Sequence, residues 1–198
     1  MSSIRNLLIV SMLLVLAGVA SAQVLEIGPQ FGVNRLSNSE LYSQADPPAV
    51  ARLKSGFRFG FRVTLNAHEY AGYEVGYGYN RTNLDLAGQV YGMATHQGFV
   101  DVLLYARPDG AKIRPFIAGG GQFSNFVPPG TSVSYGGGAT KFGGNYGAGV
   151  KVRTSDRFLI RLDFRQYLSP KPDFLQTPTP PKGWLRLNEI SAGFSYTM

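Results

Sequence analysis

The residues best suited to chemistry in this sequence are charged side chains that recur at every second position within several segments. Arg58 and Arg62 alternate with large apolar residues in one run, and Arg161, Asp163 and Arg165 do so in another. Side chains two apart in an extended strand point to the same face, so each run would bring its charges together. Charges held away from water are costly unless they are paired. We therefore expect ion pairs here rather than a catalytic centre.

Eleven charged positions share this pattern, and positive and negative members nearly balance. They are Glu26, Arg58, Arg62, Glu74, Asp101, Arg114, Lys151, Arg161, Asp163, Arg165 and Glu189. The balance predicts an internal ion-pair network that fills a lumen and fixes the register of the strands around it. The alternative is a narrow, ion-conducting or gated path that favours anions, since basic groups are in slight excess.

Other reactive residue types give little support for an enzyme. The absence of cysteine excludes disulfides, Cys-ligated metal sites and a thiol nucleophile. We expect His68 in a short turn and His96 at the border of a long loop, with Ser124, Ser132 and Ser134 in a loop nearby in sequence. A histidine with a serine suits a lipid hydrolase or acyltransferase, but the sequence has no GxSxG or HExxH motif. The prediction is therefore no catalytic residue, no metal and no cofactor.

The start of the chain has the pattern of a secretory signal peptide. Arg5 precedes an apolar run at residues 7–19, and Ala20, Ser21 and Ala22 follow it. A short basic region, an apolar stretch of this length and an A-x-A site define such a signal. We expect residues 1–22 to be removed at the Ala20/Ala22 cleavage site, which leaves residues 23–198 as one domain. The apolar run is shorter than the roughly 20 residues of a membrane-spanning helix.

The rest of the chain alternates between a large apolar face and a face of small or charged residues, which is typical of β-strands. Eight segments do so, near residues 25–33, 57–65, 73–80, 98–106, 113–123, 145–152, 158–165 and 189–198. The 25 glycines also favour sheet over helix, because glycine weakens helix interiors. Long connections, at 34–52, 81–95, 124–139 and 168–183, alternate with short ones. This alternation describes an up-and-down meander.

The apolar face is predicted to point outwards, into lipid. An eight-stranded barrel is just wide enough for its own side chains, so a bulky residue at every second position would overfill it. The opposite face, rich in Gly, Ser, Asn and Thr, is a poor soluble surface but suits a narrow polar interior. Membrane barrels also have short periplasmic turns and longer outer loops. The alternative is a soluble, lipocalin-like barrel with its apolar face inside.

Three segments carry a resemblance to a known family. They read RPFIAGGGQF at 114–123, FGGNYGAGVKVRTSDRFLIRLDFRQY at 142–167 and NEISAGFSYTM at 188–198. With the strand pattern, they resemble the small eight-stranded outer-membrane β-barrels of the OmpA-transmembrane-domain and OmpX type, over residues 23–198. The resemblance implies an all-β fold, an eight-stranded antiparallel up-and-down transmembrane β-barrel, in a Gram-negative-type outer membrane.

The resemblance also implies an insertion signal in the last strand. Members usually end in Phe or Trp, which the outer-membrane insertion machinery reads. Here Met198 is last, with Phe194 and Tyr196 on the same face. These three residues are the expected insertion signal.

The expected function is that of a non-enzymatic, porin-like envelope protein. Its polar lumen would be mostly plugged, and its surface loops would serve envelope integrity, adhesion or ligand contact. The alternatives are a narrow ion channel or small porin, and an outer-membrane lipid-modifying enzyme.

The expected partners are outer-membrane lipid, the insertion machinery and a surface ligand of the long loops. Lipopolysaccharide would be met through loop cations, namely Arg35, Arg52, Arg81 and Lys182. A monomer is expected. Nucleic-acid binding is not expected, despite the net charge of +7, because no cluster of five or more basic residues occurs.

Overall fold

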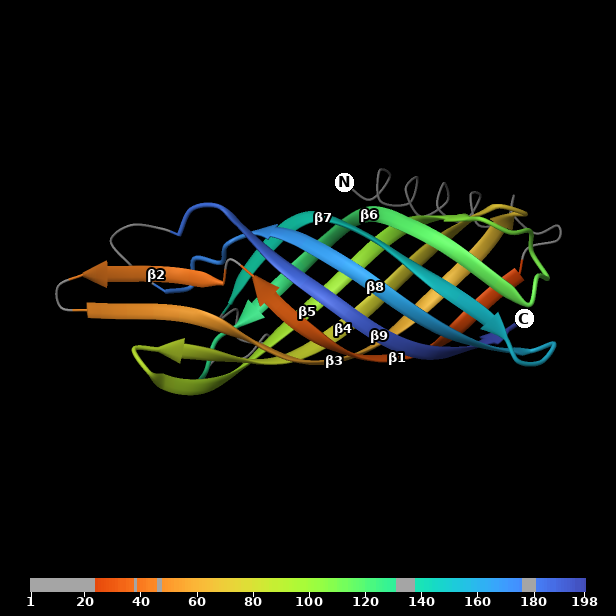
Figure 1. The fold of residues 1–198 in the computed structure, drawn as a ribbon. Coiled ribbons are helices and arrows are strands. Elements are labelled where there is room, and N and C mark those ends of the chain that lie inside the picture. The colour runs from red at the N-terminus through yellow and green to blue at the C-terminus, as the bar shows by residue number, and fades with distance from the viewer. Residues whose placement is uncertain (1–23, 38, 46–47, 131–137, 176–180) are drawn as a thin grey trace, which may run out of the picture.

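The computed structural model is a closed antiparallel β-barrel with an extension at one end (Figure 1). It describes residues 24–198 apart from 38, 46–47, 131–137 and 176–180, and the side chains of 42–49 are also outside the description. The predicted signal peptide with Ala20 and Ala22 therefore lies outside the described residues, as do Ser132 and Ser134. No helix among the described residues is long and apolar enough to span a membrane.

Eight strands form the barrel wall and a ninth, β2, lies outside it. The strands are β1 (Val24–Ser37), β2 (Glu40–Ala45), β3 (Pro48–His68), β4 (Ala71–Leu86), β5 (Gln89–Tyr105), β6 (Ile113–Val127), β7 (Ala139–Arg153), β8 (Phe158–Pro170) and β9 (Trp184–Thr197). From β3 to β9 each strand pairs with the next, and β1 pairs with both β9 and β3 to close the wall. The predicted eight-stranded up-and-down barrel is confirmed.

Alternation along each strand separates an apolar outside from a polar inside. Outward side chains such as Phe59, Ile117 and Phe164 are exposed, whereas the inward Arg58 and Glu74 are buried. Lipid requires the apolar face to lie on the outside of the wall. A soluble barrel would instead have its apolar face inside, so the soluble alternative does not fit this structure. Wall closure also leaves no free edge in the hydrocarbon region, where unpaired backbone groups are costly.

The short turns and the C-terminus lie at one end of the barrel, and the extension lies at the other (Figure 1). Short turns mark the periplasmic end of such barrels. The start of β1 joins this end, because the amide of Leu25 donates to the carbonyl of Met198 (3.2 Å) and the amide of Met198 donates to the carbonyl of Leu25 (2.8 Å). The opposite end, where β2 and the first part of β3 project, is therefore extracellular.

Two of the expected long connections are wrong, because they are largely strand. Within 34–52, β2 pairs with the first part of β3 as a hairpin. Within 81–95, β4 and β5 continue until only Ala87 and Gly88 separate them. Both residues have positive φ, 51° and 89°, as a two-residue hairpin of the I′ kind requires. The sequence hides this turn, since alanine is not the asparagine or aspartate that usually precedes the glycine.

Candidate functional site: the lumen and its outer mouth

The centre of the lumen is a network of ion pairs around Arg165. Its guanidinium bonds Asp101, its Nη2 lies 2.6 Å from Glu74 Oε1, and its Nε lies 3.6 Å from Asp163 Oδ1. Arg161 joins the same acids, because it pairs with Glu74 and its Nε lies 2.7 Å from Asp163 Oδ2. Arg165 and Glu74 are completely buried. Three strands, β4, β5 and β8, are thus tied across the interior.

The network continues towards the outer mouth through Arg62, Glu189 and Arg58. Arg62 Nη1 lies 2.8 Å from Asp163 Oδ1, and its Nη2 lies 3.3 Å from Glu189 Oε1. The second Glu189 oxygen lies 2.9 Å from Arg58 Nε. Eight of the eleven predicted positions therefore form one connected system.

The other three predicted positions form a separate group near the periplasmic end. Lys151 Nζ lies 2.5 Å from Glu26 Oε2 and 2.8 Å from the hydroxyl of Tyr105. Arg114 pairs instead with Asp109 of the β5–β6 turn, at 3.2 Å, and donates to Asn66 Oδ1 at 3.1 Å. The structure thus places all eleven side chains in the lumen, but it divides them into two groups.

Sequence reasoning missed the neutral residues that complete this interior. Four aromatic rings lie against the cations, and the Arg114 guanidinium carbon is 3.4 Å from the ring centroid of Tyr105. The rings are those of Phe99, Tyr105, Phe116 and Tyr167. The sequence does indicate their orientation. Phe99 and Tyr105 lie an even number of positions from Asp101, and Phe116 lies two positions from Arg114, so each shares the strand face of a lumen charge. Cation–π contacts of this kind compensate part of the cost of burying a guanidinium.

A layer of amides lies between the ion pairs and the outer mouth. Asn34 Nδ2 donates to Asn80 Oδ1 at 3.0 Å, and Gln97 Nε2 donates to Gln122 Oε1 at 3.1 Å and to Ser124 Oγ at 3.2 Å. These groups satisfy one another away from bulk water, as buried polar atoms must.

The outer mouth is filled by an apolar cluster, which we call the mouth cluster. Its buried members are Leu41, Ala51, Leu53, Leu84, Met93, Phe126 and Leu185, and Leu36, Leu86, Phe174 and Leu175 pack against them. Phe174 and Leu175 belong to the β8–β9 connection, which Lys141 ties to β7 through Asp173 at 2.9 Å. The described first part of this connection, up to Leu175, therefore folds over the mouth rather than away from it.

The two histidines lie apart from the lumen. His96 is on the outer wall, where its Nδ1 is hydrogen-bonded to the hydroxyl of Tyr77 and its ring lies 5.4 Å from that of Tyr79. Ser124 lies on the opposite face of the wall and is buried, so the structure does not bring these two residues together. His68 ends β3 and is exposed. Among the described residues, no group of three or more His, Asp or Glu could hold a metal ion.

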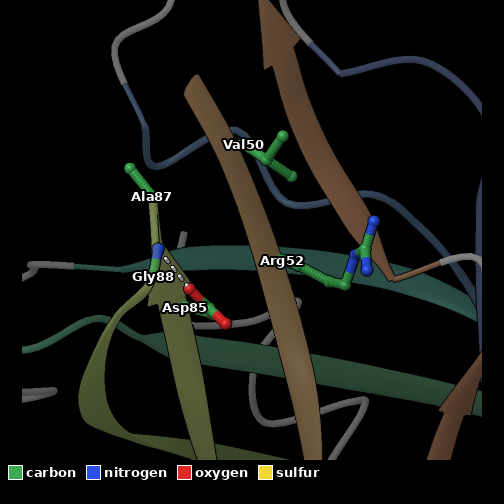
Figure 2. Close-up of a pocket in the computed structure, with 5 residues that line it drawn as sticks. All are labelled: Val50, Arg52, Asp85, Ala87 and Gly88. Atoms are coloured by element: carbon green, nitrogen blue, oxygen red, sulfur yellow. Dashed lines mark hydrogen bonds between the residues drawn. The ribbon is translucent and has the colours of Figure 1, made fainter. Parts of the chain in front are cut away.

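The extracellular extension carries an open pocket of about 390 Å³ beside the first part of β3 and the tip of the β4–β5 hairpin. Val50, Arg52, Asp85, Ala87 and Gly88 line it (Figure 2). Asp85 accepts a hydrogen bond from the Gly88 amide at 2.9 Å (Figure 2). The ammonium of Lys54 lies 2.9 Å from the other Asp85 oxygen. The Lys54 hydrogen bond, followed by that of Gly88, lowers the pKa of Asp85 below its ordinary value.

The predicted insertion signal lies on the outer wall of β9 and just beyond its end. Phe194 and Met198 are exposed, and the ring of Tyr196 packs edge-on against that of Phe158 at 5.4 Å. All three residues therefore face the surroundings of the barrel at its periplasmic end.

Comparison with known proteins agrees with this architecture. The sequence matches the family model described as the outer membrane protein beta-barrel domain over residues 8–197. No curated protein matches the sequence.

Several solved structures share the fold. OprG from Pseudomonas aeruginosa has 14% sequence identity and a TM-score of 0.66, covering 89% of this chain and 96% of its own. The Neisserial surface protein A has 12% identity and a TM-score of 0.57, covering 88% and 97%. Ail of Yersinia pestis has 13% identity and a TM-score of 0.50, covering 89% and 99%.

The family model spans nearly the whole chain and the fold is that of outer-membrane barrels. An apolar outer wall, a polar lumen and short turns at one end are the features that such proteins need in a Gram-negative outer membrane. The chain belongs to the outer membrane protein β-barrel domain family.

Proposed function

We propose that this protein is a non-conducting, non-enzymatic barrel whose function lies at its extracellular end. The observation that carries the proposal is that the lumen is closed at two levels, by the ion-pair network in the middle and by the mouth cluster above it. An eight-stranded wall leaves room for little more than its own side chains. An ion would therefore have to displace buried side chains at both levels.

The network resists opening because its charges depend on one another. Arg165 contacts three acids, and Glu189 bridges Arg58 and Arg62. Removing one partner from a buried pair leaves an uncompensated charge, which costs several kcal/mol. This dependence supports a structural plug rather than a chain of transient ion-binding sites.

Conductance in planar bilayers tests the closed lumen. We expect no single-channel steps from the purified protein at physiological salt. Discrete steps that vanish on neutralising Arg62 or Arg165 would contradict the proposal and favour the narrow channel.

The extracellular extension is the part best placed for contact with a surface ligand. The β2–β3 hairpin stands beyond the barrel wall (Figure 1), and its pocket combines the exposed Arg52 with Asp85 and the bare backbone of Gly88. Arg52 is held by Glu40 at 3.1 Å, with roughly half of each side chain exposed. An exposed pair of this kind exchanges partners at little cost, so Arg52 is free to meet an anionic ligand.

Binding of a sulfated saccharide is a direct test of this contact. The Ail structure contains the heparin analogue sucrose octasulfate, which makes that compound a suitable first probe. We expect Arg52→Gln with Lys54→Gln to weaken its binding, and Arg157→Gln in a periplasmic turn to leave it unchanged. Equal binding by all three proteins would contradict a ligand site at the pocket.

Lipid deacylation tests the non-enzymatic part of the proposal. His96 lies beside Tyr77 and Tyr79 on the outer wall, and Ser124 faces the lumen. We expect no acyl release from outer-membrane lipid by either the parent protein or His96→Ala. Release that is lost in His96→Ala would overturn the proposal.

We further propose that the protein is a monomer and that Phe194, Tyr196 and Met198 guide its insertion. Phe194 and Met198 are exposed at the end of β9, with the half-buried Tyr196 between them on the same face, and this supports the role. Replacing Met198 with Phe should speed folding by the insertion machinery in reconstituted vesicles, and an unchanged rate would count against the signal.

A further inference from the structure

A row of hydrogen-bonded polar side chains crosses the outer wall on four neighbouring strands. The hydroxyl of Tyr146 donates to Gln166, Gln166 Nε2 donates to Asn188 Oδ1 at 2.6 Å, and Asn188 Nδ2 donates to Ser37 Oγ at 3.4 Å. These residues belong to β7, β8, β9 and β1 in order around the wall. We call them the polar row.

On β9 and β1 the polar row lies where the outward face changes from apolar to polar, at the level of the outer-leaflet headgroups. On β8 the outward residue before Gln166 is Phe164, and on β9 the one after Asn188 is Ile190; both are exposed and apolar. Val33 continues the same band on β1. Since polar groups in hydrocarbon are costly, the hydrocarbon ends just below the row on β9 and β1.

Two arginines flank this row at the same level. Arg35 on β1 lies opposite Asn188, and Arg186 on β9 lies opposite Ser37. The two are thus diagonal neighbours on adjacent strands, with side-chain origins roughly 7–8 Å apart. Both side chains are exposed. Neither has an acidic partner within 4.0 Å among the described residues.

We propose that Arg35 and Arg186 form a binding site for the phosphate of a phosphorylated outer-leaflet glycolipid. Arginine suits this ligand because its fork of N–H groups bonds phosphate oxygens in pairs. Asn188 and Ser37 lie between the two arginines and offer further hydrogen-bonding groups to the sugar. The apolar band below, with Val33 and Ile190, receives the acyl chains.

Charge and position together favour a lipid over a soluble anion. The two arginines lie on the side of the wall, directly above its lipid-facing band, rather than on the extension that stands clear of it. The site depends only on the outer-membrane location, so a conducting lumen would not affect it.

Native mass spectrometry of the purified barrel with lipid A tests the proposal. The probes are lipid A carrying both phosphates and the same lipid after dephosphorylation. We expect Arg35→Gln and Arg186→Gln each to weaken binding of the phosphorylated form about fivefold, the usual contribution of one basic residue near anionic lipid. The double variant should bind it no better than the parent binds the dephosphorylated form.

Arg157→Gln is the matched control, since it removes one exposed arginine from a periplasmic turn, and it should bind as the parent does. Heat-modifiable gel mobility verifies that each variant is folded. Equal binding of both lipids by the parent, or parent-like binding by the double variant, would overturn the site. A larger loss of sucrose octasulfate binding than of lipid A binding would assign the two arginines to a surface saccharide instead.

Discussion

At the scale of single residues, alternation alone locates the lumen charges but does not identify their partners. Arg161, Asp163 and Arg165 are two apart on β8, so a strand must place them on one face. The acids and arginines that meet them come from β3, β4 and β5, and no local pattern states which pairs form. Arg114 illustrates the limit, because its partner Asp109 lies in a turn where the two-residue period does not apply.

Arg165 is the residue on which most of the network depends. Replacing it with Met should destabilise the barrel by about 3–5 kcal/mol, because Asp101 and Glu74 would lose a buried partner. Urea unfolding in detergent micelles measures the loss. Adding Asp101→Asn should recover part of it, since Arg165 is the only ion-pair partner of Asp101 among the described residues, whereas Glu74 keeps Arg161. Arg157→Met, at an exposed turn, should change stability by less than about 0.5 kcal/mol. An equally small effect of Arg165→Met would contradict the dependence described above.

Two glycines on opposite faces of the wall provide a matched test of packing. A Cβ at Gly76 would lie 2.2 Å from the Phe99 ring, and one at Gly98 would lie 2.3 Å from the Phe123 ring. Phe99 is buried beside Arg62, so its ring has less room to shift than that of Phe123, which is 41% exposed and can swing into lipid.

We therefore expect Gly76→Ala to cost about 1–3 kcal/mol, the usual cost of overpacking a core, and Gly98→Ala to cost clearly less. The same unfolding assay compares the two variants. A larger cost at Gly98 would mean that the outer wall is as tightly packed as the lumen.

At the scale of strands, the sequence predicted the membrane-crossing segments better than the extracellular extension. Within the membrane, a lipid face and a lumen face impose strict alternation, as in Phe57 to Leu65. Beyond it, Leu53 and Leu84 turn inwards towards the mouth cluster, but their neighbours face water and vary in type. For this reason the sequence predicted a loop at the position of β2, although β2 contributes Leu41 to the mouth cluster.

The β4–β5 hairpin should respond to pH through Asp85. Lys54 and the Gly88 amide lower the pKa of Asp85. These two contacts therefore stabilise the hairpin fully at pH values above the ordinary aspartate pKa. The stabilisation is lost as the pH falls through the lowered value. We expect the Gly88 amide proton shift, followed by NMR, to titrate with a midpoint below the ordinary range.

Lys54→Gln should raise that midpoint more than Arg52→Gln does, because the Lys54 hydrogen bond is the largest cause of the shift and the charge of Arg52 is the smallest. The reverse order would show that the two cations exchange places at the carboxylate in solution.

At the scale of the whole molecule, the lumen is closed by two groups of side chains, one charged and one apolar. The network in the middle is held by charges that need partners, and the mouth cluster is held by burial of apolar surface. The mouth cluster depends on chain segments far apart in sequence, since Leu41, Met93 and Phe174 come from a hairpin, a wall strand and a connection. The two closures are therefore expected to open independently.

The absence of cysteine allows this independence to be measured by labelling a single introduced thiol. Met93 is 1% exposed within the mouth cluster, so Met93→Cys should not react with a charged, water-soluble thiol reagent. Removing the covering side chains with Phe174→Ala and Leu175→Ala should admit water and make the same thiol reactive. Tyr91→Cys, two residues further out along β5 on the same face and exposed there, should react in both backgrounds.

The uncovered variant should still show no conductance, because the pairs around Arg165 and Glu189 remain in place below the mouth. Reaction of Met93→Cys in the parent background would show that water already reaches the mouth cluster. Steps in the uncovered variant would show that the network alone does not block ions, and that the mouth cluster is the only closure of the lumen.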